Sequence, residues 1–125
     1  MIYLDTHVVE EICQRNFRAL SKEARRLMNR EVEFRISPMV LLELEYLHEI
    51  GRIRLGAQEI LTRFGASIGL RVCDLPFHDV AWQAASESWT RDPFDRVIVA
   101  QARLAKAVLI SRDSDVLRNY HKAIG

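Results

Sequence analysis

The residues best suited to catalysis in this sequence are acids spread along the whole chain: Asp5, Glu43, Asp95 and Asp113. Carboxylates gathered in one cleft repel one another and raise each other's pKa. Mg²⁺ and Mn²⁺ relieve that repulsion because they prefer oxygen ligands. Such ions activate water near neutral pH and stabilise the leaving oxygen of a phosphoryl displacement. Acidic side chains alone would therefore suffice for metal-dependent phosphodiester hydrolysis.

Asp5 and Asp113 are singled out because each follows a short apolar run that favours a β-strand. If the two strands are neighbours in a parallel sheet, both carboxylates emerge at the same edge. Asp115 competes with Asp113, since the loop could carry a helix cap at Ser114 or Asp115. Asp113 lies nearer the strand and is the better ligand, which leaves Asp115 as an outer member of the site.

Glu43 is singled out by its neighbours on a helix that Ser37 and Pro38 are suited to begin. The residues one turn away from it are apolar: Met39, Val40, Tyr46 and Leu47. A carboxylate in such surroundings costs free energy unless something compensates it, and a metal ion would do so. The alternative is a partly exposed Glu43 that pairs with a nearby arginine such as Arg52.

Asp92 and Asp95 open a further helix in the segment Asp92-Pro93-Phe94-Asp95. Asp92 before a proline is a good N-cap, and a carboxylate at position 95 also suits the helix dipole. Both residues could therefore be purely structural. The division that we favour makes Asp92 the cap and Asp95 the metal ligand.

The elements that must position these acids alternate along the chain. Strands are expected at residues 2–4, 34–36, 70–73 and 108–110. Helices are expected at residues 7–16, 21–30, 38–50, 57–64, 78–89, 93–106 and 115–121. Gly51 and Gly65 serve as the expected stop signals of two of these helices. Such alternation predicts an α/β fold with a mainly parallel sheet, whose ligands bind beyond the carboxyl ends of the strands.

Composition limits the class of protein further. With 125 residues, 49% of them hydrophobic and 28% charged, the chain is expected to form a single domain over residues 1–125. No apolar run reaches the roughly 18 residues that cross a bilayer, and the N-terminus turns acidic too early for a secretory leader. We therefore expect a cytoplasmic protein with no membrane association. The net charge is only +1, but residues 14–30 are rich in arginine, which suits either an RNA backbone or a solvated helix face.

Four segments in order give the chain a family resemblance: IYLDTHVV, SPMVLLELEYLHEIGRI, RDPFDRVIVAQA and VLISRD. Over nearly its whole length the chain resembles PIN-domain ribonucleases, and among them the VapC-type toxins of type II toxin–antitoxin pairs. The third segment followed closely by the fourth is the most specific part. The resemblance implies a three-layer α/β/α sandwich around a mainly parallel sheet of about five strands.

The resemblance also implies roles for individual residues. The metal ligands, which would hold Mg²⁺ or Mn²⁺, would be Asp5, Glu43, Asp95 and Asp113. Hydroxyl groups are expected beside the first and last acids, where Thr6 and Ser111 stand, with Asp92 and Asp115 as further surrounding residues. Arg96 and Arg112 are candidates for contact with RNA. His7 stands where many relatives carry Asn, and we expect it to make a structural hydrogen bond.

The implied activity is divalent-metal-dependent endoribonuclease cleavage of cellular RNA, often tRNA or rRNA, which inhibits translation. The implied partners are a second copy of the chain in a homodimer and a VapB-type antitoxin, whose tail places a basic side chain in the acidic cleft. Relatives usually continue past the final helix into a last short strand. This chain stops at Gly125, so that strand is either very short or has been trimmed.

Three other interpretations stay open. A PIN nuclease of RNA processing would have no antitoxin, and a neighbouring antitoxin reading frame would separate it from a toxin. A non-catalytic protein-binding module is disfavoured because all four ligand positions are acidic. A phosphotransferase that uses Asp5 as nucleophile would want a second aspartate two residues on, where this chain has His7.

Overall fold

Five short strands form the centre of the structure, a computed structural model that describes residues 1–31 and 33–125. They are β1 (Ile2–Leu4), β2 (Phe34–Ile36), β3 (Leu70–Val72), β4 (Val108–Ile110) and β5 (Ala123–Ile124). All pair in parallel, in the order β3-β2-β1-β4-β5. Strands β1 and β4 are therefore neighbours, as expected from the acids Asp5 and Asp113 that follow them. Leu4 at the end of β1 pairs with Ile110 at the end of β4.

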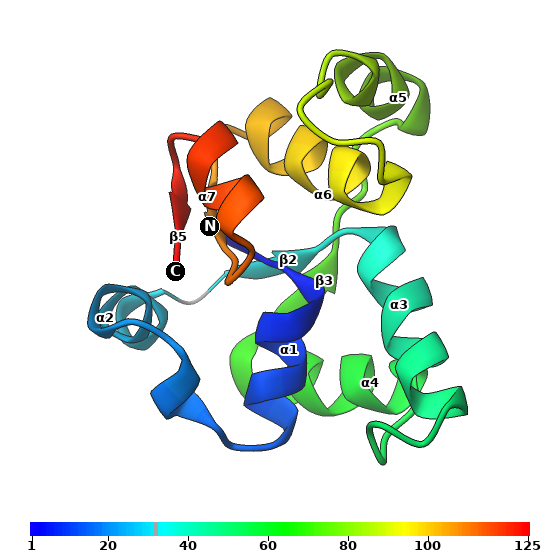
Figure 1. Ribbon diagram of the computed structural model, residues 1–125. Coiled ribbons are helices and arrows are strands. Elements are labelled where there is room, and N and C mark those ends of the chain that lie inside the picture. Colours follow the sequence, from blue (N-terminus) through cyan, green and yellow to red (C-terminus); the bar gives the residue numbers. More distant parts are fainter. Residues whose placement is uncertain (32) are drawn as a thin grey trace.

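Helices fill the connections between these strands in the described part of the chain. They are α1 (Thr6–Cys13), the 3₁₀ helix η1 (Phe17–Ala19), α2 (Lys22–Arg30), α3 (Pro38–Glu49), α4 (Ala57–Ile68), α5 (Phe77–Ala85), α6 (Pro93–Leu104) and α7 (Ser114–Asn119). Right-handed crossovers and this strand order put α1 to α4 on one face of the sheet and α5 to α7 on the other. Figure 1 shows α5 and α6 above the strands and α1, α2 and α4 below them. The predicted three-layer α/β/α architecture is confirmed.

The three central strands, β2, β1 and β4, are largely buried between the two helical layers. Leu4, Ile36, Leu109 and Ile110 are completely shielded from solvent. Such continuous apolar runs are typical of parallel strands between two helical layers. No described helix is both long and apolar enough to span a bilayer.

Several helix ends lie where the sequence predicts them. The Ser37 side chain accepts a hydrogen bond from the backbone N–H of Met39 at the start of α3, with proline at the first helical position. Gly51 follows the end of α3 with a φ of 79°, the left-handed conformation that glycine adopts most easily. Ser21 likewise caps α2.

Two predicted helix ends are wrong. The helix predicted over 57–64 does not stop at Gly65 but continues to Ile68, and Gly69 is the residue in the left-handed conformation, with φ 73°. A single glycine inside a helix costs only about 1 kcal/mol, which tertiary packing outweighs here. The first helix ends at Cys13 rather than residue 16, since Arg15 has a φ of 55° and the chain then turns into η1.

Two further helices differ from the prediction near the site. The helix predicted over 78–89 ends at Ala85, which leaves residues 86–92 as a loop before α6. The last helix covers 114–119 instead of 115–121, because Asp113 is its cap. The last strand, β5, has two residues in the given sequence.

Candidate active site

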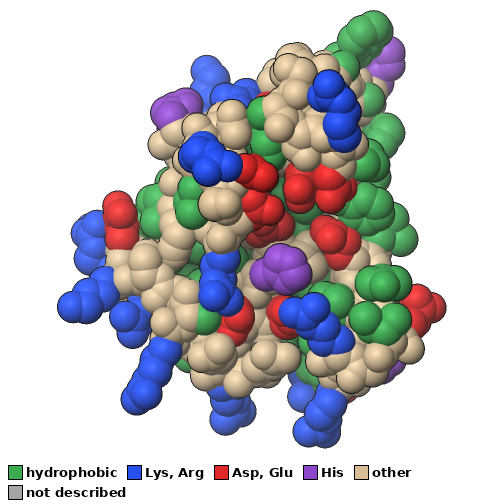
Figure 2. Space-filling view, in the orientation of Figure 1, with side chains coloured by type: hydrophobic (Ala, Val, Ile, Leu, Met, Phe, Trp, Pro, Cys, Tyr) green, Lys and Arg blue, Asp and Glu red, His purple; other side chains and the backbone are tan. Residues whose placement is uncertain are grey.

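The four candidate ligands meet at the carboxyl edge of the sheet. Asp5 directly follows β1, and Asp113 lies between β4 and α7. Glu43 and Asp95 belong to the first half of α3 and the first turn of α6. A helix that connects parallel strands runs back along the sheet, so its first turns lie at that same edge. Figure 2 shows acidic side chains gathered in the middle of this face.

Asp5 is the most rigidly held of the acids. Its Oδ1 accepts a hydrogen bond from the backbone N–H of Thr6 at 2.8 Å, and its Oδ2 accepts one from the Ser111 hydroxyl at 2.6 Å. The same hydroxyl accepts from the backbone N–H of Asp113 at 3.1 Å, which joins the ends of β1 and β4. Burial raises the pKa of Asp5, although the hydrogen bonds from Ser111 and Thr6 act in the opposite direction.

Glu43 is linked to Asp5 through Thr6. The Thr6 hydroxyl donates to Glu43 Oε1 at 2.7 Å, so this threonine connects α3 to the end of β1. Arg52 pairs with Glu10 on α1, so the alternative pairing with Glu43 is wrong. Burial raises the pKa of Glu43, and the nearby carboxylate of Asp5 adds to the effect.

Asp95 has the most unusual environment of the four. Within residues 1–31 and 33–125, no hydrogen-bond donor or basic side chain pairs with its carboxylate. Burial raises its pKa to about 7, and four other carboxylates add to the effect: Asp92, Asp5, Asp113 and Glu43. A half-buried carboxylate that faces only other acids is compensated most directly by a cation.

Asp92 and Asp113 each accept backbone hydrogen bonds at the start of a helix and also lie among the gathered acids. Asp92 Oδ1 accepts from the N–H of Phe94 at 2.8 Å, which confirms it as the cap of α6. Asp113 Oδ1 accepts from the N–H of Asp115 at 2.7 Å, so the cap of α7 is Asp113 and not residue 114 or 115. Each carboxylate uses one oxygen as a cap, and its Oδ2 accepts no hydrogen bond from the described residues.

The donor set fits Mg²⁺ or Mn²⁺, because every candidate ligand atom is a carboxylate oxygen. No three histidine, cysteine, aspartate or glutamate side chains of the described residues are placed so as to hold a metal ion as they stand. Uncompensated carboxylates repel one another, so a cation would draw them closer together. The hydroxyl groups of Thr6 and Ser111 donate to Glu43 and Asp5 and would keep these two carboxylates in place during that movement.

The remaining predicted residues lie around this centre. Asp115 pairs with Arg118 on the exposed surface of α7, outside the group of interacting acids. Arg96 donates through Nε to the carbonyl of Thr90 at 2.8 Å, which fixes the loop before α6. Arg112 donates to Glu11 on α1 at 2.6 Å and keeps nearly half of its side chain exposed.

Three buried acids were missed by the sequence reasoning: Glu10, Glu11 and Glu87. Glu87 accepts from Arg103 Nε at 2.6 Å and from the indole N–H of Trp89 at 2.7 Å. Burial alone would raise the pKa of Glu87, but these hydrogen bonds bring it below its ordinary value. The network fastens the loop of residues 86–92, which leads to Asp92. No hydrophobic periodicity in the sequence around Glu87 indicates that this residue is buried.

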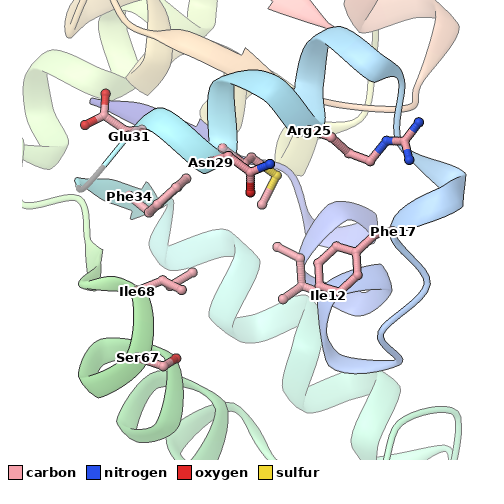
Figure 3. A pocket seen from close by; sticks show the side chains of 9 residues that line it. Ile12, Phe17, Arg25, Asn29, Glu31, Phe34, Ser67 and Ile68 are labelled. Carbon is pink, nitrogen blue, oxygen red and sulfur yellow. The ribbon is translucent and has the colours of Figure 1, made fainter.

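One pocket in the described part of the chain lies away from the acids. It measures about 640 Å³ and is lined mainly by apolar side chains from α1, η1, α2, β2 and α4. Figure 3 shows Ile12 and Phe17 on one side of it and Phe34 and Ile68 on another. None of the gathered acids is among the residues that line it. A mainly apolar pocket suits a hydrophobic group better than it suits phosphodiester chemistry.

The free energy of unfolding of the metal-free chain should fall as the pH rises from 5 to 8. The folded cleft raises the pKa of Asp95 from 3.8 to about 7, so folding favours its protonated form, and that stability is lost as the pH rises through 7. After allowance for solvent screening, we expect a loss of about 2 kcal/mol. Urea unfolding in EDTA at each pH measures it, with Asp95→Asn as the comparison. Parallel pH profiles for the two proteins would contradict the assignment.

The fold is similar to that of several solved structures. A toxin–antitoxin complex from Klebsiella pneumoniae has a TM-score of 0.64 at 14% identity, covering 100% of this chain and 97% of that chain. VapBC2 from Rickettsia felis, bound to a promoter DNA fragment, has a TM-score of 0.63 at 19% identity, with coverages of 99% and 96%. A DNA-bound VapBC from Salmonella typhimurium has a TM-score of 0.60 at 18% identity, with coverages of 94% and 89%.

Sequence comparison identifies the family directly. No curated protein sequence matches the chain. The PIN domain family, however, matches residues 2–122. That match includes all four acids at the carboxyl edge of the sheet. The chain therefore belongs to the PIN-domain family.

Proposed function

We propose that this protein is a divalent-metal-dependent endoribonuclease and the toxin of a VapBC-type pair. The observation that carries the proposal is the Asp95 carboxylate, half-buried among other acids with no cation or donor from the described residues to compensate it. Membership of the PIN-domain family supports a nuclease. The similar folds within toxin–antitoxin complexes support the toxin role.

The chain's own residues would hold the ion and keep its ligands in place. Mg²⁺ or Mn²⁺ would bind to Asp5, Glu43, Asp95 and Asp113. When bound, such an ion supplies positive charge to the cleaved phosphate and to the attacking water. Ser111 and Thr6 donate to the first two of these acids and fix their orientation. The backbone N–H groups at the start of α7 fix the fourth.

The resemblance to VapC-type toxins supports a substrate and partners for this cleft. The substrate would be cellular RNA, such as tRNA or rRNA, whose cleavage stops translation in the cytoplasm. A VapB-type antitoxin would inhibit the enzyme by placing a basic side chain among the gathered acids, because such a group offsets their repulsion as an ion does. The active form would be a homodimer.

Glu43→Gln should lower kcat/KM for RNA cleavage by at least about 100-fold, because the neutral amide is a poor ligand for a hard cation. Glu49→Gln is the matched control, since Glu49 is an exposed carboxylate at the other end of the same helix, and its effect should stay within about twofold. The assay follows a labelled RNA with Mn²⁺ and with EDTA. Equal cleavage by the two variants, or RNA left intact by the wild type with Mn²⁺, would contradict the proposal.

The toxin role is tested inside cells. Brief expression of the wild type should arrest growth and create new RNA 5′ ends that are absent with Glu43→Gln. Co-expression of the antitoxin encoded beside the gene should restore growth. Cleavage in vitro without growth arrest would leave a nuclease of RNA processing and refute the toxin.

A further inference from the structure

Two neighbouring acids of α1 are buried, and each of them holds an arginine at the surface. Arg52 Nη2 donates to Glu10 Oε1 at 3.3 Å, and its Nε lies 3.0 Å from Glu10 Oε2. Arg112 Nη1 donates to Glu11 Oε1 at 2.6 Å. The glutamate side chains are only 6% and 11% exposed, whereas the arginine side chains are 55% and 45% exposed. The buried acids thus serve as anchors for two largely exposed cations.

Stability alone does not account for this arrangement. A buried carboxylate carries a desolvation cost that its partner only partly offsets, and well-packed apolar residues would do at least as well. Glu11 shows the cost directly, because its Oε2 is buried and accepts no hydrogen bond within the described part of the chain. What the two pairs do provide is a fixed position for two guanidinium groups.

That position borders the acidic cleft. The helix α1 begins immediately after Asp5, so Glu10 and Glu11 lie one turn, about 5.4 Å, beyond Thr6 and His7. Arg112 also directly precedes Asp113 in the chain. Figure 2 shows basic side chains on both sides of a histidine just below the gathered acids.

If the substrate is a polyanion, a negatively charged cleft needs cations such as these arginines at its border. The gathered carboxylates repel RNA phosphates, and fixed cations beside them would offset that repulsion during approach. A guanidinium has five N–H donors in a planar fork. Arg52 directs two nitrogens at Glu10, and Arg112 directs one at Glu11, so each keeps donors for an outer anion. Phosphate oxygens match that fork geometry.

We infer that Arg52 and Arg112 form a phosphate clamp, anchored by Glu10 and Glu11, that binds the backbone of single-stranded RNA beside the cleaved phosphate. This inference rests on the proposed RNA cleavage and adds to it the residues that position the substrate. Arg52 lies in the loop between α3 and α4, so the clamp joins two distant segments of the chain.

Binding of a fluorescently labelled single-stranded RNA, measured in an Asp95→Asn background with Mg²⁺, tests the clamp. Arg52→Gln and Arg112→Gln should each raise Kd about tenfold at low salt. Each should also reduce the magnitude of the negative slope of log K against log salt by about 0.7. Arg63→Gln is the matched control, because Arg63 forms an exposed pair with Glu59 on α4. Its Kd should stay within about twofold of the background.

Paired variants separate substrate binding from folding. Arg112→Gln leaves Glu11 buried without a partner, whereas Glu11→Gln/Arg112→Gln and Glu10→Gln/Arg52→Gln remove both charges together. The paired variants should keep the Tm of the background and still lose RNA affinity. Paired variants that fold and bind RNA as tightly as the background would overturn the clamp. Wild-type chain that binds RNA through both arginines but never cuts it would refute the nuclease and leave the clamp standing.

Discussion

Asp95→Asn should lower kcat for RNA cleavage by about a thousandfold or more while the protein stays folded. The substitution removes one negative charge from a cluster in which burial and four other carboxylates already raise the pKa of Asp95 to about 7. The amide keeps the shape of the side chain, so the packing of α6 is retained. Because like-charge repulsion falls, the metal-free variant should unfold at a higher temperature than the wild type at pH 8.

Metal binding provides a second measurement on the same variant. Mn²⁺ should raise the Tm of the wild type in proportion to its binding free energy, and Asp95→Asn should lose most of that increase. Asp79→Asn is a suitable control, since Asp79 is an exposed carboxylate on α5, outside the group of interacting acids. A variant that keeps both the metal-dependent rise in Tm and the cleavage rate would show that Asp95 holds no ion.

The fold and the gathering of the four acids at one edge of the sheet were predictable, because local sequence signals indicate both. Short apolar runs before Asp5 and Asp113 marked two strands, and Asp92-Pro93 marked the start of α6. The rule that ligands lie beyond the carboxyl ends of parallel strands then identified the edge of the sheet at which the structure gathers these acids. The sequence alone did not show that β1 and β4 are neighbours. Strand order depends on contacts between segments that are separated by most of the chain.

Local sequence patterns could not predict the contacts between side chains that lie far apart in the sequence. The sequence predicts an unusual environment for Glu43 but not its partner, which is Thr6, 37 positions away, and not Arg52. Gly65 and Gly69 carry the same local stop signal, and only the packing of α4 decides which of them ends the helix. Nothing in the sequence pairs Glu87 with Arg103, since their contact depends on how α6 lies against the preceding loop.

Arg103→Ala should lower the free energy of unfolding by about 3 kcal/mol, because it leaves the buried carboxylate of Glu87 without its cation. Arg103 also donates to the carbonyl of Asn119 at 3.1 Å and lies 4.9 Å from the centre of the Tyr120 ring. The side chain therefore ties α6 both to the loop of residues 86–92 and to the end of α7. Urea unfolding at pH 7 measures the loss.

Arg118→Ala provides the matched control, because Arg118 forms an exposed pair with Asp115 on α7 and its loss should cost less than about 0.5 kcal/mol. The pH dependence gives an independent check. Folding lowers the pKa of Glu87, so its stabilisation is present above the ordinary glutamate pKa of 4.5 and is lost as the pH falls below it. In Arg103→Ala that acid-side loss should shrink, since the arginine is a main cause of the lowered pKa. A variant as stable as the wild type at pH 7, with the same acid-side profile, would mean that Trp89 and Gln83 alone satisfy Glu87.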